Sequence, residues 1–150
     1  MPKILILYYS RTGNTEKMAK ALVEGAQRVS EVDVQLSIDF EVTSEDLTTA
    51  DAILVGTPTY NHEAARSTQK VFEDAAVKGI SLKDKVGASF GSYGWSGEAP
   101  KLILEIMTNR FEMDVVTQPL LIKYTPDDAG LIKCRELGYQ IAKKISQPTC

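Results

Sequence analysis

Ile4-Leu5-Ile6-Leu7-Tyr8-Tyr9 leads directly into Ser10-Arg11-Thr12-Gly13-Asn14-Thr15 near the start of the chain. The first half of this stretch is an unbroken apolar and aromatic run, which is typical of a strand buried on both faces of a parallel sheet. The second half is polar and surrounds one glycine, and apolar residues then recur at helical spacing from Met18 to Ala26. We therefore expect a strand, a polar loop and a helix whose N-terminus is capped by Thr12 or Asn14.

The alternation of strand and helix continues along the chain. Further strands are predicted at 32–38, 52–55, 86–90 and 115–124, and further helices at 66–77, 100–107 and 131–145. The first of these strands alternates apolar and polar residues, as expected at a sheet edge, and Pro119 interrupts the last one. About five alternations with right-handed crossovers predict an α/β fold, a doubly wound parallel sheet between two layers of helices. Ligands of such folds bind outside the carboxyl ends of the strands.

Length and composition limit the class of protein. The chain has 150 residues, of which 43% are hydrophobic and 25% charged, values typical of one globular domain, which we expect to span 1–150. The net charge of −3 is spread among interspersed acids and bases, a pattern that disfavours nucleic-acid and membrane partners. The N-terminus lacks the pattern of a signal peptide, and Cys134 and Cys150 are expected to be free thiols, so a cytoplasmic location is predicted.

The loop after the first strand has the chemistry of an anion site. Its backbone N–H groups and hydroxyls precede a helix, whose N-terminus carries partial positive charge. The lysine of an ATP or GTP phosphate loop does not follow Gly13, because the nearest one, Lys17, already belongs to the helix. We interpret the loop as a phosphate cradle; a polar turn that only caps the helix is the alternative.

These residues also carry a resemblance to a known family. The loop 10–15 resembles the T-x-x-N-T-like phosphate signature of flavodoxins, and Thr57-Pro58-Thr59-Tyr60-Asn61 resembles the flavodoxin loop along the isoalloxazine ring. The stretch 91–98, Gly-Ser-Tyr-Gly-Trp-Ser-Gly-Glu, resembles the flavin loop in the flavodoxin domain of flavodiiron proteins. The resemblance spans essentially the whole chain and fits the short-chain form of the family. It implies a flavodoxin-like five-stranded sheet in the order 2-1-3-4-5, one noncovalently bound FMN, and electron transfer between redox partner proteins by a monomer or weak dimer.

The predicted site combines the three loops. Its cofactor-binding residues are expected to be Ser10, Arg11, Thr12, Gly13, Asn14, Thr15, Thr57, Pro58, Thr59, Tyr60, Asn61, Ser92, Tyr93, Gly94, Trp95 and Gly97. Flat aromatic side chains can stack on a tricyclic ring and exclude water, and Tyr60, Tyr93 and Trp95 are the candidates. Which of the last two stacks more closely stays open. No metal ligand and no catalytic acid or base is expected, because a flavin carries out the redox chemistry itself.

Two residues of the second loop concern the tuning of the flavin. Flavodoxins often have glycine after the aromatic residue of this loop, whereas this chain has Asn61. Asparagine tolerates positive φ less freely than glycine, so weaker stabilisation of the one-electron-reduced flavin is expected. His62 is either a sensor of flavin reduction or, as a lone histidine more often is, a surface residue.

Three other functions compete with the electron carrier. An FMN-dependent NAD(P)H:quinone oxidoreductase with the same fold is the main alternative, although such relatives commonly have longer inserts. A phosphoreceiver module would need acidic residues at the ends of the first and third strands, where Tyr9-Ser10 and Gly56-Thr57 stand instead. A docking domain that has lost its flavin would not need the aromatic and glycine-rich loops.

Overall fold

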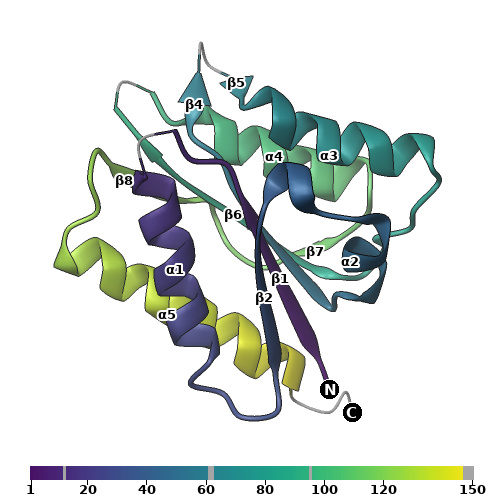
Figure 1. Cartoon of the computed structure of the whole chain (residues 1–150), viewed down its shortest axis with the longest axis horizontal. Coiled ribbons are helices and arrows are strands. Elements are labelled where there is room, and N and C mark those ends of the chain that lie inside the picture. The colour runs from purple at the N-terminus through teal and green to yellow at the C-terminus, as the bar shows by residue number, and fades with distance from the viewer. Residues whose placement is uncertain (12, 61–62, 95, 147–150) are drawn as a thin grey trace.

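The computed structural model describes residues 1–11, 13–60, 63–94 and 96–146, and every structural statement below concerns these residues. Strands alternate with helices along most of the chain (Figure 1). The strands are β1 (Lys3–Tyr8), β2 (Asp33–Ile38), β3 (Ala52–Gly56), β4 (Thr59–Tyr60), β5 (Glu63–Ala64), β6 (Val86–Tyr93), β7 (Asp114–Val115) and β8 (Leu120–Lys123). The helices are α1 (Asn14–Ala26), the 3₁₀ turn η1 (Asp39–Glu41), α2 (Ser44–Thr49), α3 (Arg66–Val77), α4 (Glu98–Asn109) and α5 (Asp128–Ser146).

The main sheet is parallel and has the order β2-β1-β3-β6-β7, and β8 also pairs with β6. Asp114 of β7 lies opposite Val86, whereas Leu120 of β8 lies opposite Phe90, so the two short strands follow one another along the same edge. The break between them contains Pro119, which has no N–H to donate to the ladder. The expected order 2-1-3-4-5 is confirmed, with β2 at an edge and the fifth position shared by β7 and β8.

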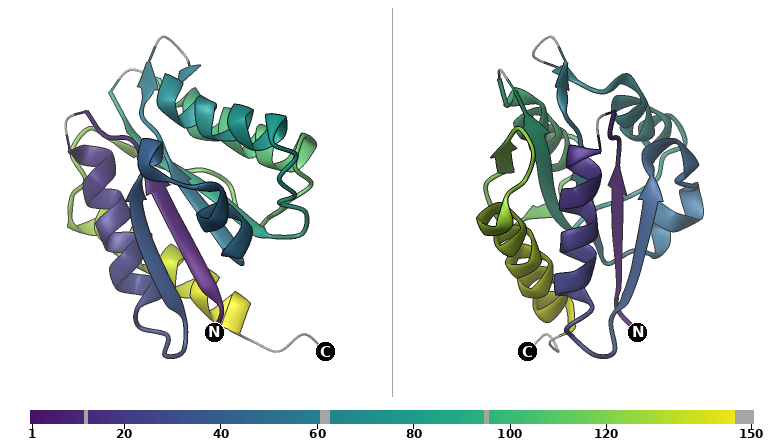
Figure 2. Two further views of the ribbon diagram at one scale, coloured as in Figure 1. Left: turned by 45° about the vertical axis from the view of Figure 1, so that its right-hand side comes forward. Right: turned by 60° about the vertical axis from the view of Figure 1, so that its left-hand side comes forward.

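Helices cover both faces of the sheet, as the expected three-layer architecture requires (Figure 2). Ile4, Ile6 and Tyr8 of β1 point to one face, where they join a core completed by α1 and α5. The alternate residues Leu5 and Leu7 point to the other face, which α2, α3 and α4 cover. The apolar run of β1 therefore contributes to two separate cores, which is why this strand contains no exposed polar position at its centre.

Two features of the structure differ from the sequence-based expectation. The short helix α2 was not expected; it begins with a capping box in which the Thr43 hydroxyl accepts from Asp46 N at 3.1 Å and the Asp46 carboxylate accepts from Thr43 N at 2.9 Å. The second loop also contains a small antiparallel hairpin, β4–β5, in which Tyr60 lies opposite Glu63. This hairpin belongs to the loop that follows β3, and so lies at the same end of the sheet as the first and third loops.

Candidate functional site

A cavity of about 380 Å³ lies at the carboxyl ends of β1, β3 and β6. Its volume is in the range of small-molecule binding sites. It is lined by Ser10, Arg11, Asn14, Thr15, Pro58, Thr59, Ser92, Tyr93, Gly94 and Tyr124. All of these except Tyr124 belong to the predicted site, so three loops distant in the sequence meet around one hollow.

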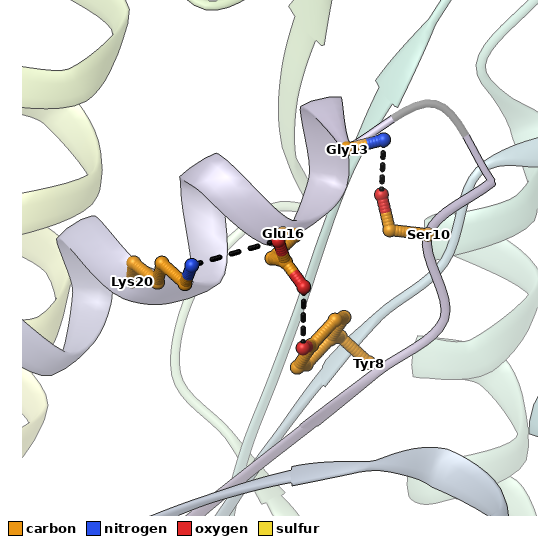
Figure 3. A network of polar contacts seen from close by, with 5 residues as sticks. All are labelled: Tyr8, Ser10, Gly13, Glu16 and Lys20. Atoms are coloured by element: carbon orange, nitrogen blue, oxygen red, sulfur yellow. Dashed lines mark hydrogen bonds and ion pairs between the residues drawn. The ribbon is translucent and has the colours of Figure 1, made fainter.

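The first loop forms an open cradle at the N-terminus of α1. Gly13 precedes the helix with φ +91°, and its N–H donates to the Ser10 hydroxyl at 3.0 Å (Figure 3). Apart from Gly13 itself and its chain neighbours, no heavy atom of the described residues lies within 4 Å of the position that a Cβ of Gly13 would occupy, so this side of the loop is open. The first N–H groups of a helix have no acceptor within the helix, and they favour an anion there.

The expected helix cap needs a correction. Gly13 is the N-cap residue and makes no side-chain cap bond, and Asn14 is the first residue of α1 rather than its cap. Thr12, the other candidate, lies outside the described residues. Asn14 lines the cavity instead.

A second set of polar contacts lies one turn further along α1. The Tyr8 hydroxyl donates to the Glu16 carboxylate at 2.8 Å, and the Lys20 ammonium lies 3.5 Å from the same carboxylate (Figure 3). Burial, followed by the bond to Glu16, raises the pKa of Tyr8 to about 12. The same hydrogen bond, with help from Lys20, lowers the pKa of Glu16. The network joins the end of β1 to the first turn of α1 and so fixes the two ends of the cradle.

The second loop contains one structural and one accessible threonine. Thr57 is fully buried; its hydroxyl accepts from Ala65 N at 3.0 Å and donates to Pro58 O at 3.0 Å, so it holds the loop in shape and does not line the cavity. Thr59 does line the cavity, and its hydroxyl accepts from Ala99 N at 3.1 Å. Of Tyr60 only the backbone is described, and Asn61 and His62 lie outside the described residues.

The third loop is tied to the first. Ser92 N donates to the Thr15 hydroxyl at 3.3 Å, and both residues are buried. Tyr93 and Gly94 line the cavity, whereas Gly97 caps α4 and is not among the lining residues. Trp95 lies outside the described residues. Gly91 belongs to the third loop but was not among the expected cofactor-binding residues. A Cβ there would collide with the carbonyl oxygen of Thr57, so glycine lets the second and third loops approach closely.

Tyr124 is the lining residue that the sequence did not indicate. It follows β8 directly, so its position at the carboxyl end of the last strand was the available signal. Its backbone N–H donates to Tyr93 O at 2.7 Å, and its carbonyl accepts from the Ser92 hydroxyl at 2.5 Å. Its φ of 58° is a left-handed conformation that costs a tyrosine about 1–2 kcal/mol.

The cavity fits a ligand that has an anionic end and a flat end. The cradle of Ser10, Gly13 and Thr15 provides hydroxyls and helix N–H groups beside Arg11, which suits a phosphate. Pro58, Tyr93 and Gly94 also line the cavity and provide apolar and aromatic surface for a planar ring. The donors of the first loop and the apolar and aromatic lining of the cavity therefore suit FMN.

Comparison with known proteins gives the same result. The family model "Flavodoxin" matches residues 6–138. The chain is 35% identical over 150 residues to the type A flavoprotein fprA of Rhodobacter capsulatus, covering 95% of this chain and 33% of that protein. It is 30% identical over 165 residues to a flavodoxin of Aquifex aeolicus, covering 97% of this chain and 88% of that protein. Among solved structures, a flavodoxin from the domain Archaea superposes with a TM-score of 0.88 at 38% identity, covering 97% and 99% of the two chains.

The chain belongs to the flavodoxin family, whose members bind FMN and transfer electrons. The similarity to the flavodoxin-like part of flavodiiron proteins is also present in structure: rubredoxin oxygen:oxidoreductase from Desulfovibrio gigas gives a TM-score of 0.85 at 29% identity, covering 96% of this chain and 36% of that one. The chain spans about a third of the length of the first curated relatives that it matches.

Proposed function

We propose that this chain binds one FMN in the three-loop cavity and passes electrons between two redox partner proteins. The observation that carries this proposal is the convergence of a helix-terminal anion cradle and an aromatic wall on one hollow of about 380 Å³. Neither feature alone would distinguish FMN from other phosphorylated ligands. Together they match the two chemically different ends of this cofactor.

The residues of the first loop hold the phosphate in this proposal. The Ser10 and Thr15 hydroxyls and the first N–H groups of α1 donate to its oxygens, and Arg11 adds a positive charge. The Tyr8–Glu16 bond keeps the end of β1 and the first turn of α1 at a fixed separation. Because these groups are in place before the ligand arrives, binding does not have to order them.

The second and third loops hold the flavin ring. Pro58 and Thr59 form one wall and Tyr93 and Gly94 the other, and the bond from Ser92 to Thr15 fixes the ring loop relative to the phosphate loop. Bound FMN supplies the ability to accept and release electrons. The protein excludes water, orients the ring and sets the hydrogen bonds around it, and no side chain has to act as a general acid or base. The roles proposed for Thr12, Tyr60, Asn61 and Trp95 remain predictions from the sequence.

The first experiment identifies the cofactor and separates the two candidate activities. The purified protein is expected to contain one FMN per chain, identified by absorbance and mass after release, and to be reduced by dithionite without turning over NAD(P)H. Rapid NAD(P)H oxidation with a quinone would make the chain an oxidoreductase. A colourless protein that does not bind added FMN would contradict the proposal.

The redox partners and the cellular location are also part of the proposal. We propose protein partners in the cytoplasm, and the buried free thiol of Cys134 agrees with a reducing compartment. None of the helices in the described ranges combines the length and apolar character needed to cross a bilayer. A single domain that is a monomer or weak dimer also remains a prediction, which limited proteolysis and sedimentation velocity can test.

A further inference from the structure

Tyr124 combines three properties that its fold alone does not require. It lines the cavity, the residue is 62% exposed, and its backbone has a positive φ of 58°. The ring lies beside the third loop: a Cβ placed on Gly94 would be 3.3 Å from Tyr124 Cε1. Glycine and asparagine adopt this backbone angle at a lower steric cost than tyrosine.

The hydrogen bonds of Tyr124 do not explain the choice of tyrosine. The bonds to Tyr93 and Ser92 use only the backbone N–H and C=O of Tyr124, so glycine would keep both. The Lys123 ammonium lies 5.5 Å from the centre of the ring, which is a contact at an exposed site. Replacing Tyr124 by glycine would remove an aromatic side chain from the lining of the cavity. Strain kept in the backbone of a residue at a binding site suggests that the side chain serves the ligand.

We propose that Tyr124 is a further FMN-binding residue, whose ring packs against the flavin part of the cofactor rather than its phosphate. This inference rests on the proposed binding of FMN in the same cavity. Two placements support the flavin part: the ring borders Gly94 in the loop that holds the isoalloxazine ring, whereas the anion cradle is built around Gly13 and the Ser10 hydroxyl. The backbone bonds to Ser92 and Tyr93 hold the ring in place, so the third loop and Tyr124 form one side of the cavity.

The test uses a substitution that relieves the strain and removes the ring. In Tyr124→Gly the apoprotein is expected to melt at the same temperature as the wild type or higher, because relief of the steric strain at positive φ offsets the larger backbone entropy that glycine loses on folding. Its dissociation constants for FMN and for riboflavin, measured by quenching of flavin fluorescence, should both rise at least fivefold. Tyr124→Phe keeps the ring and should bind both ligands within about twofold of the wild type.

A matched control separates strain relief from loss of the ring. Glu31 has φ 66° and lies in the turn before β2, at the other end of the sheet from the cavity. Glu31→Gly should therefore leave both dissociation constants unchanged while it also relieves a positive φ. If Tyr124→Gly does not fold, Tyr124→Asn serves in its place, because asparagine tolerates this conformation.

The outcomes distinguish this inference from the proposed function. If the wild type binds FMN and Tyr124→Gly binds both ligands within twofold of it, the role of Tyr124 is wrong and the proposed function stands. A loss confined to FMN would also overturn it, because the ring would then serve the phosphate. If the wild type binds neither ligand, both proposals fail.

Discussion

The hydrogen bond from Tyr8 to Glu16 links the end of β1 to the first turn of α1, the two elements that flank the anion cradle (Figure 3). A hydrogen bond to a charged group contributes about 1.5–3 kcal/mol when sheltered, and less where water competes. Since the Glu16 side chain is 39% exposed, we expect about 1 kcal/mol here. Tyr8→Phe removes the bond and keeps the ring in the core.

The pH dependence of this effect follows from the two pKa shifts. The pKa of Glu16 is lowered in the folded state, so the stabilisation is present above the unfolded value and disappears as the pH falls through the folded one. The pKa of Tyr8 is raised to about 12, so the stabilisation is also lost as the pH rises toward that value. Measured by urea unfolding, the free energy of unfolding of the wild type should exceed that of Tyr8→Phe by about 1 kcal/mol at neutral pH. The difference should be smaller near pH 3. An unchanged gap at low pH would contradict the assignment.

At the same scale, the sequence predicted which loops meet better than it predicted what each side chain contacts. Ser10, Thr15 and Tyr93 were expected to bind the cofactor because their loops follow strands at the same end of the sheet. All three line the cavity, and their contact with a cofactor stays a prediction. Thr57 was expected to bind the cofactor, yet its hydroxyl is used by Ala65 and Pro58. Whether a threonine serves a ligand or its own loop depends on a hairpin that no local pattern indicates.

Helices α1 and α5 approach each other closely at two glycines. A Cβ on Gly25 would collide with the carbonyl oxygen of Arg135, and one on Gly138 would collide with the carbonyl oxygen of Leu22. Each glycine therefore lets the backbone of the other helix approach it. These collisions involve main-chain atoms, which cannot move away as a flexible side chain would.

Replacing Gly25 by alanine should destabilise the protein, although this replacement usually stabilises a helix. Alanine normally favours a helix interior over glycine by about 1 kcal/mol. Gly25→Ala should nevertheless lower the free energy of unfolding by about 2 kcal/mol, because the two helices must separate and lose packing. Lys17→Ala, at an exposed position of the same helix, should stay within about 0.5 kcal/mol of the wild type. Denaturant unfolding measures both, and equal stability of the two variants would show that the helices adjust freely.

Elements with long apolar periodicity were predictable, and short ones were not. Helix α3 occupies Arg66–Val77 as its spacing predicts, and Pro119 indicates the break between β7 and β8. Helix α2 has only six residues and one buried side chain, Leu47, so its hydrophobic signal is too weak to recognise. Its capping box was the available clue, but Thr, Ser and Asp are equally common in turns.

In the whole molecule, stability and binding are separated in space. The two cores lie on the faces of the sheet, while the cavity lies at one end of it, formed by loops. A ligand that binds only the folded protein raises its stability by RT ln(1 + [L]/Kd), about 2.7 kcal/mol at a hundredfold excess over Kd. FMN should therefore raise the melting temperature without changing the fold.

The size and form of this rise give the last prediction. For a domain of this length, 1 kcal/mol corresponds to roughly 2–4 °C, so FMN at about 100 times its Kd should raise the melting temperature by roughly 5–10 °C. Each further tenfold increase in FMN should add roughly 3–6 °C, because it adds about 1.4 kcal/mol. Thr15→Val removes a cradle hydroxyl, so its melting temperature should rise with the same slope but only at higher FMN concentrations. Calorimetry at several FMN concentrations measures how the melting temperatures of the wild type and of Thr15→Val depend on FMN. A melting temperature that does not change with FMN would show that the cavity does not bind it.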